Sequence, residues 1–239
     1  MALIEEWEKT GQKLFRYRGQ IPVLFLLIEL AYLYFHPYRE DSAFFYRSLG
    51  YFLVTLLGFL IRIQSIGHAG ERSSGRNRKQ QVAEVLNTSG WYSMVRHPLY
   101  LGNFLMWLGL ALYTESAWFI LIFCLVYWLY YERIMFTEES FLRKKFGQQY
   151  LQWAENTPPF LPRFKNYRKP EHPFQAFRVL KSEYHILLEV PGLFLVLDIV
   201  RNYNIYNAFH PDMFWVWLFG VCALLWVIFR IRFKMFRKH

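Results

Sequence analysis

Six apolar segments constrain this chain more than any other feature, and they lie at residues 21–35, 43–63, 99–113, 118–131, 186–200 and 213–229. Several are shorter than the ~20 residues that a helix needs to cross a ~30 Å hydrocarbon core, so tilt or flanking Trp and Tyr must extend them. With 54% hydrophobic and 21% aromatic residues, the 239-residue chain is too apolar for an ordinary soluble domain. The sequence therefore predicts an all-α fold, a polytopic membrane helical bundle with about six transmembrane helices.

The basic residues indicate how these helices are oriented. If the segments alternate across the bilayer from an inner N-terminus, Arg39 and Arg201 fall in outer loops and Arg47 in the outer part of the second span. All the others of the 28 Lys and Arg residues then fall on the inner side. This asymmetry predicts an integral membrane protein with both termini in the cytosol. It also argues against a nucleic-acid partner, because no basic run accompanies a nucleic-acid-binding motif.

Three features of the apolar segments are structural rather than chemical. Glu29 interrupts the first segment and no small-x-small pattern follows it, which favours a retained helix over a cleaved signal peptide. Cys124 and Cys222 are far apart and lack metal-ligand spacing, so we expect packing residues and no metal site. The short link at 114–117 predicts an antiparallel helical hairpin.

Glu29 and Arg47 are also expected to meet. Counting inward from the outer boundary places them at similar depth in adjacent antiparallel spans. An unpaired charge in the hydrocarbon costs at least ~2.5–3.5 kcal/mol, which favours an ion pair between them.

The polar residues gather in two inner segments, 64–98 and 132–185. The first contains GHAGERSSGRNRKQQ, which predicts a loop that is either a solvated connector or a lid over a substrate. It ends in Arg96, His97 and Pro98, and the proline predicts that a helix begins there. A helix start beside an arginine favours a bound carboxylate or phosphate, although Arg96 could equally anchor the chain to lipid head groups.

The second inner segment opens with YYERIMFTEESFLRKKFGQQYLQW, residues 130–153. Glu139 has Arg143 four positions later, which is typical of a surface salt bridge. Glu138 instead lies on the apolar stripe of the predicted helix, with no cation at helical spacing. A carboxylate there needs a partner from elsewhere, either a cationic ligand or a distant arginine.

Taken together, GWYSMVRHPLYLGN, the hairpin, EESFLRKKFGQQYLQW and PPFLP resemble the isoprenylcysteine carboxyl methyltransferase and phospholipid methyltransferase superfamily of membrane enzymes. The resemblance covers about residues 86–162. It implies a cytosolic S-adenosylmethionine site within a helical membrane bundle. The catalytic candidates that it implies are Arg96 and His97. The cofactor-binding candidates are His97, Tyr100, Gly102, Glu138, Glu139, Phe146, Gly147 and Tyr150.

The function that the resemblance implies is methyl transfer to a membrane-embedded lipid or lipid-modified acceptor. The reacting group could be a carboxylate, phosphate or amine, with O-methylation of isoprenylcysteine as the reference reaction. An anionic acceptor needs no general base, whereas an amine would use one, and His97 has a suitable ordinary pKa. No metal is expected.

The chain departs from the family after Leu161 and Pro162, where many relatives end, because it continues to residue 239. We therefore expect three parts: an N-terminal two-helix membrane segment (1–63), a methyltransferase-like core (64–165) and a C-terminal extension with two further membrane helices (166–239). The extension either anchors the chain or forms a cradle for an anionic head group.

Two other classes remain open. Sterol reductases share the architecture and a related Arg-His turn but bind NADPH; Pro98, Leu99, Asn103 and the Glu-Glu pair favour the methyltransferase class. A small transporter is suggested by Glu29, Arg47 and Asp198 in or near spans, without an internal repeat to support it.

Overall fold

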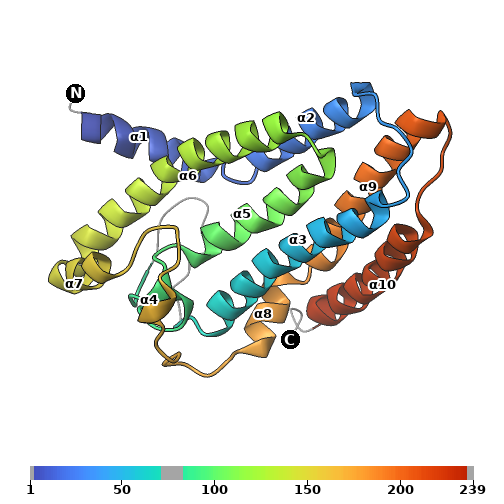
Figure 1. Ribbon diagram of the computed structural model, residues 1–239. Coiled ribbons are helices and arrows are strands. Elements are labelled where there is room, and N and C mark those ends of the chain that lie inside the picture. Colours follow the sequence, from blue (N-terminus) through green and yellow to red (C-terminus); the bar gives the residue numbers. More distant parts are fainter. Residues whose placement is uncertain (1–2, 71–82, 236–239) are drawn as a thin grey trace.

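The computed structural model describes residues 3–70 and 83–235, which form helices joined by loops and one isolated antiparallel bridge (Figure 1). The α-helices are α1 (Leu3–Arg16), α2 (Ile21–Phe35), α3 (Phe44–Gly67), α4 (Trp91–Met94), α5 (Pro98–Ala111), α6 (Ala117–Phe146), α7 (Gln148–Asn156), α8 (Ala176–Glu183), α9 (Ile186–Tyr206) and α10 (Met213–Met235). Two 3-10 turns, η1 (Leu112–Thr114) and η2 (Phe164–Asn166), complete them.

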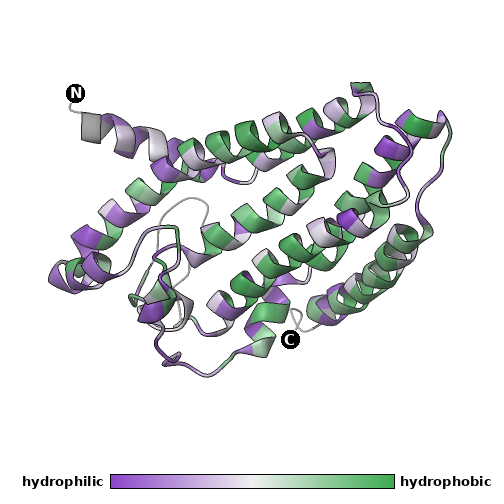
Figure 2. Cartoon of the chain, viewed as in Figure 1, coloured by the Kyte–Doolittle hydropathy of each residue, from purple (hydrophilic) through white to green (hydrophobic). Residues whose placement is uncertain are grey.

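The predicted all-α membrane bundle is confirmed, and each of the six apolar segments is helical. Among the described residues, α3, α6 and the part of α10 up to Lys234 are long and apolar enough to cross a membrane. Helices α1 and α2 are long and apolar enough to cross a membrane only when taken together, as a pair bent by 69°. Figure 2 shows apolar residues along the middle of the long helices and hydrophilic ones at the ends of the bundle. The chain is thus an integral membrane protein.

Helices α3 and α5 approach each other closely because small residues line their contact. A Cβ added at Gly58 would lie 2.4 Å from the carbonyl oxygen of Gly102. A Cβ at Gly109 would lie 2.5 Å from the carbonyl oxygen of Tyr51. Contacts between small residues of this kind hold membrane helices together. They fix the position of α5, whose first residue follows the Arg-His pair.

The link between α5 and α6 forms the predicted helical hairpin (Figure 1). Glu115 ends η1 in the left-handed conformation, with φ +50°. The Ser116 side chain then caps α6 by accepting a hydrogen bond from the Phe119 amide at 3.3 Å. The hairpin tip lies at the end of the bundle away from α4 and α7 (Figure 1).

Sequence analysis missed helix α1, although Trp7 and Leu14 have helical spacing. The helix packs on the inner half of α6, where the Tyr130 hydroxyl donates to the Leu14 carbonyl at 2.9 Å. The Arg133 guanidinium lies 3.5 Å from the centre of the Trp7 ring. A Cβ on Gly11 would collide with Thr137, so α1 is closely fitted to α6.

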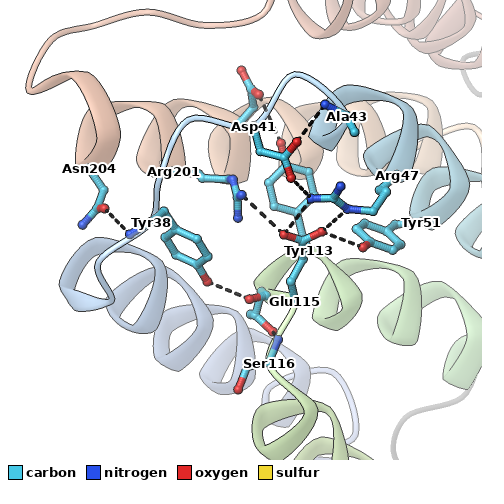
Figure 3. A network of polar contacts seen from close by, with 12 residues as sticks. Tyr38, Asp41, Ala43, Arg47, Tyr51, Tyr113, Glu115, Ser116, Arg201 and Asn204 are labelled. Atoms are coloured by element: carbon cyan, nitrogen blue, oxygen red, sulfur yellow. Dashed lines mark hydrogen bonds and ion pairs between the residues drawn. The ribbon is translucent and has the colours of Figure 1, made fainter.

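The expected pair between Glu29 and Arg47 is wrong. Arg47 binds Glu115 at 2.5 Å and Asp41 at 2.7 Å at the hairpin end of the bundle (Figure 3). Glu29 is buried, and its Oε1 has no hydrogen-bond partner in the described part of the chain. Depth along a helix does not fix the direction of a side chain around its axis. Arg47 is directed toward the hairpin tip, and α2 packs mainly on α9.

The C-terminal extension packs on the rest of the bundle through several elements. Helix α9 contacts α2 and α10, and α8 contacts α3. The Phe233 ring of α10 lies 5.7 Å from Phe177 and 5.5 Å from Tyr184, centre to centre.

Cys124 and Cys222 are free and partly buried in their helices. The division at 63 and 165 stays a prediction.

Candidate active site

The Arg-His turn is held by backbone hydrogen bonds at the end of the bundle away from the hairpin tip. The Arg96 amide donates to the Pro158 carbonyl at 2.8 Å, and the Arg163 amide donates to the Met94 carbonyl at 2.9 Å. Val95 between them is fully buried. His97 is not helical, and α5 begins at Pro98 as predicted. The loop after α7 therefore fixes the backbone that presents Arg96 and His97.

Glu139 binds both residues of this turn. Its Oε2 lies 2.5 Å from Arg96 Nη1, and its Oε1 lies 2.9 Å from His97 Nε2. A carboxylate only accepts hydrogen bonds, so His97 Nε2 carries the proton of that bond. The expected surface pairing of Glu139 with Arg143 is replaced by these contacts, because α6 directs Glu139 toward the turn before α5.

Glu138 is the less constrained of the two carboxylates. Its Oε2 lies 3.7 Å from His97 Nδ1, and a third of its side chain is exposed. That distance is longer than a hydrogen bond. Glu138 thus lies beside the site with its oxygens accessible.

Tyr100 forms an aromatic wall of the site. Its ring stacks on His97 with centres 5.5 Å apart and lies 5.0 Å from the ring of Tyr131. The Tyr127 hydroxyl donates to the Tyr100 carbonyl at 2.8 Å. These contacts fix the plane of the His97 imidazole.

Tyr150, from α7, completes the cluster. Burial raises the pKa of its hydroxyl, and the negative charge of Glu139 raises it further, while Arg96 lowers it. Within the described residues, Tyr150 Oη and Arg96 Nε are both buried without a hydrogen-bond partner. The Tyr150 hydroxyl also lies close enough to Arg96 and Glu139 for both to act on its pKa. Buried polar atoms are almost always paired, so these two atoms are candidates for contact with a ligand.

The other three candidates have structural roles. A Cβ at Gly102 would lie 2.6 Å from Arg62 Cγ and 2.7 Å from the Gly58 carbonyl oxygen. Gly147 has φ +53° where α6 ends, a conformation that glycine adopts without strain. Phe146 is partly exposed at the same helix end, with Lys145 Nζ 5.7 Å from its ring centre. Their part in cofactor binding stays a prediction.

Sequence analysis missed Arg62, which lies beside the site. Two of its nitrogens bind the Glu183 carboxylate at 2.7–3.0 Å, and Nη1 binds Asn103 at 2.5 Å. Burial and the charge of Glu138 raise the pKa of Tyr92, and Arg62 lowers it, so Tyr92 lies near both charges. An arginine at the inner end of an apolar segment resembles an ordinary flanking charge, and no sequence signal links it to Glu183.

Comparison with known proteins matches residues 46–149 to the phospholipid methyltransferase family. A cobalt-zinc-cadmium resistance protein, CzcN, of Cupriavidus metallidurans is 42% identical over 35% of this chain and 38% of its own length. A protein-S-isoprenylcysteine O-methyltransferase of Schizosaccharomyces pombe is 32% identical over 44% of this chain and 48% of its own. Protein-S-isoprenylcysteine O-methyltransferase A of Arabidopsis thaliana is 36% identical over 46% of this chain and 56% of its own length. No solved structure matches.

These matches confirm the superfamily that the motifs indicate. The matched region belongs to the isoprenylcysteine carboxyl methyltransferase and phospholipid methyltransferase superfamily. The chain spans about half or less of the length of the first relatives that it matches. Arg96, His97, Glu138 and Glu139 lie inside the matched region, and Tyr150 directly follows it.

Proposed function

We propose that this protein transfers a methyl group from S-adenosylmethionine to the polar group of a membrane-embedded lipid or lipid-modified acceptor. The observation that carries the proposal is the pair of buried, unpartnered atoms, Arg96 Nε and Tyr150 Oη, beside Glu138 and His97. The superfamily match of residues 46–149 supports the reaction class.

The residue types fit this cofactor. S-adenosylmethionine carries an ammonium, a sulfonium and a carboxylate, and it would supply the methyl group already activated for displacement. Glu138, exposed and without a hydrogen bond from a protein cation, would accept from the ammonium. Arg96 Nε and Tyr150 Oη would donate to the carboxylate. The set therefore matches both charges of the amino-acid end.

The protein's own residues have to align the acceptor and exclude water. Glu139 orients Arg96 and His97 through its two hydrogen bonds. Arg96 then positions an acceptor that is a carboxylate or phosphate, which is already anionic and needs no base. With an amine acceptor, His97 takes the proton.

The proposed topology places this site on the cytosolic side. The cluster lies between α4 and α5, at the end of the bundle opposite the hairpin tip (Figure 1). Most Lys and Arg residues belong to segments at this end, which agrees with the positive-inside pattern. Both chain termini would then face the cytosol.

The test is transfer of radiolabelled methyl from S-adenosylmethionine to a total lipid extract, with the purified protein in detergent. We expect label in the organic phase, and strongly reduced label with Arg96→Lys, because an ammonium cannot reproduce the planar fork of a guanidinium. Lys165→Gln, an exposed change outside the cluster, is the matched control. Label confined to water-soluble products would contradict a lipid acceptor.

A further inference from the structure

The C-terminal extension and the core together line an open cavity of about 420 Å³ on the side of the candidate active site where α4 lies. Its walls come from the end of α3, from α4 and from residues 167–173 of the extension. Trp91 lines the cavity and begins α4, which ends two residues before Arg96. We propose that this cavity binds the anionic head group of the lipid acceptor. This inference rests on the proposed function and names where the acceptor is held.

The extension wall is fastened to the core by backbone hydrogen bonds. The Gly90 amide donates to the Arg168 carbonyl at 3.0 Å, and the Arg168 amide donates to Ser93 Oγ at 2.9 Å. The Gln175 amide donates to the Gly67 carbonyl at 2.9 Å. These bonds bracket the cavity-lining residues on both sides, so the cavity is a built feature rather than a gap between loose segments.

Two glycines allow the wall to fit. Gly90 has φ +59°, and a Cβ there would lie 3.3 Å from Pro170 Cγ. A Cβ at Gly67 would lie 2.1 Å from the Phe174 ring. At Gly67 the extension approaches the core more closely than a Cβ would allow, and at Gly90 the positive φ favours glycine.

The lining is mostly apolar, and several of its side chains carry hydrogen-bond donors. His68, Trp91, Tyr167, Lys169 and His172 line the cavity, with Glu171 as the one carboxylate among the described lining residues. His68 Nδ1 donates to the His172 carbonyl oxygen at 2.8 Å, so this proton is already used within the protein. Trp91, Tyr167, Lys169 and His172 are the other lining side chains with donors. A phosphate or carboxylate accepts from several such donors at once. The aromatic and proline faces suit the organic part of a head group.

The surface around the cavity matches a membrane interface. Tyr167 is 58% exposed and Phe174 is 42% exposed, and Arg168 and Lys169 are exposed between them. Aromatic and basic residues in combination are typical of chain lying at the head groups of a bilayer. A ligand reaching the cavity from there is an amphiphile with its head group directed inward.

The glutamate at the end of α8 holds this part of the extension against the active site. Glu183 is buried and binds Arg62 through both carboxylate oxygens, and Arg62 also binds Asn103 of α5. Asn103 lies six residues after His97 in the same motif region. This ion pair thus joins α8 of the extension to α3 and, through Asn103, to α5, the helix that begins after the Arg-His turn.

The test is binding of dihexanoylphosphatidic acid to the full chain in detergent, measured by native mass spectrometry, with dihexanoylphosphatidylcholine as the zwitterionic reference. We expect preference for phosphatidic acid. The double variant Lys169→Gln with His172→Gln should weaken its binding about tenfold, as expected for loss of one charged hydrogen bond. Gln64→Trp, which fills the cavity without changing charge, should weaken it at least as much.

Lys165→Gln is the matched control, because Lys165 is an exposed lysine of the same segment outside the cavity. Equal losses for Lys165→Gln and the cavity variants would show general surface attraction and overturn the proposal. Cavity variants that weaken S-adenosylmethionine binding and leave phosphatidic acid binding unchanged would assign the cavity to the cofactor instead. Failure of the proposed function itself would appear as absent S-adenosylmethionine binding in the unchanged protein, whatever the lipid result.

Discussion

The two ends of the bundle carry clusters of the same residue types with different degrees of completeness. The inner cluster is Arg96, His97 and Glu139, and the outer cluster is Arg47, Glu115 and Arg201 (Figure 3). In each, one carboxylate binds two cationic or imidazole groups from other elements. An arginine and a glutamate in contact therefore do not define an active site.

The two clusters differ in what surrounds those polar atoms that lack a hydrogen bond. Arg201 Nε and Nη1 lack hydrogen bonds, but the guanidinium lies 3.5 Å from the centre of the Phe44 ring and 4.1 Å from that of Tyr38. Such ring faces stabilise a buried cation. Among the described residues, no ring lies over Arg96 in this way, and its Nε stays without a partner. We therefore propose that a ligand completes the inner cluster.

The largest effect is expected for Arg201→Met. This change removes a buried cation that joins α9 to Glu115 and to two rings, so we expect a loss of about 3 kcal/mol in the free energy of unfolding. Affinity for S-adenosylmethionine should stay within twofold. Thermal unfolding and calorimetric titration of the same sample measure the two quantities. A variant that stays folded but loses cofactor binding would show that the two clusters do not act separately.

Glu139→Gln should have the next largest effect, and on turnover rather than on stability. The amide keeps the shape of the side chain but weakens its bonds to Arg96 and His97, worth about 2 kcal/mol together. Methyl transfer should fall about thirtyfold. Steady-state assays at saturating cofactor measure it, and unchanged turnover would show that Glu139 does not orient the two residues.

Glu138→Gln should act mainly on cofactor affinity. Glu138 lies 3.7 Å from His97 Nδ1, beyond hydrogen-bond distance, and the substitution removes the charge that would face the ammonium. We expect about tenfold weaker binding, or about 1.4 kcal/mol. Glu138→Gln should weaken cofactor binding more than Glu139→Gln does. A larger loss of affinity for Glu139→Gln would refute this assignment.

Asp41→Asn should have the smallest effect, because Asp41 is an exposed residue at the edge of the outer cluster. The Arg47 guanidinium holds the pKa of Asp41 below its ordinary value. Asp41 therefore stabilises the fold above its ordinary pKa, and the contribution disappears as the pH falls through its pKa in the folded protein. Melting temperatures measured from neutral to acid pH should lose part of their acid dependence in Asp41→Asn.

The sequence could predict what depends on composition and on single turns. The apolar segments predicted the long apolar helices. Pro98 predicted the start of α5 at the residue where the helix begins. What it could not predict depends on rotation about helix axes: Glu139 faces the turn rather than Arg143, and Arg47 faces the hairpin rather than Glu29. The pair of Arg62 and Glu183 joins residues 121 positions apart, beyond any local pattern.

The central claim is that the inner cluster binds S-adenosylmethionine. The most direct measurement is calorimetric titration of the purified protein with S-adenosylmethionine and, separately, with NADPH, each repeated on Glu138→Gln. The account predicts saturable binding of S-adenosylmethionine that weakens in the variant, and no binding of NADPH. Tight NADPH binding without any S-adenosylmethionine binding would contradict it and place the chain among the membrane reductases.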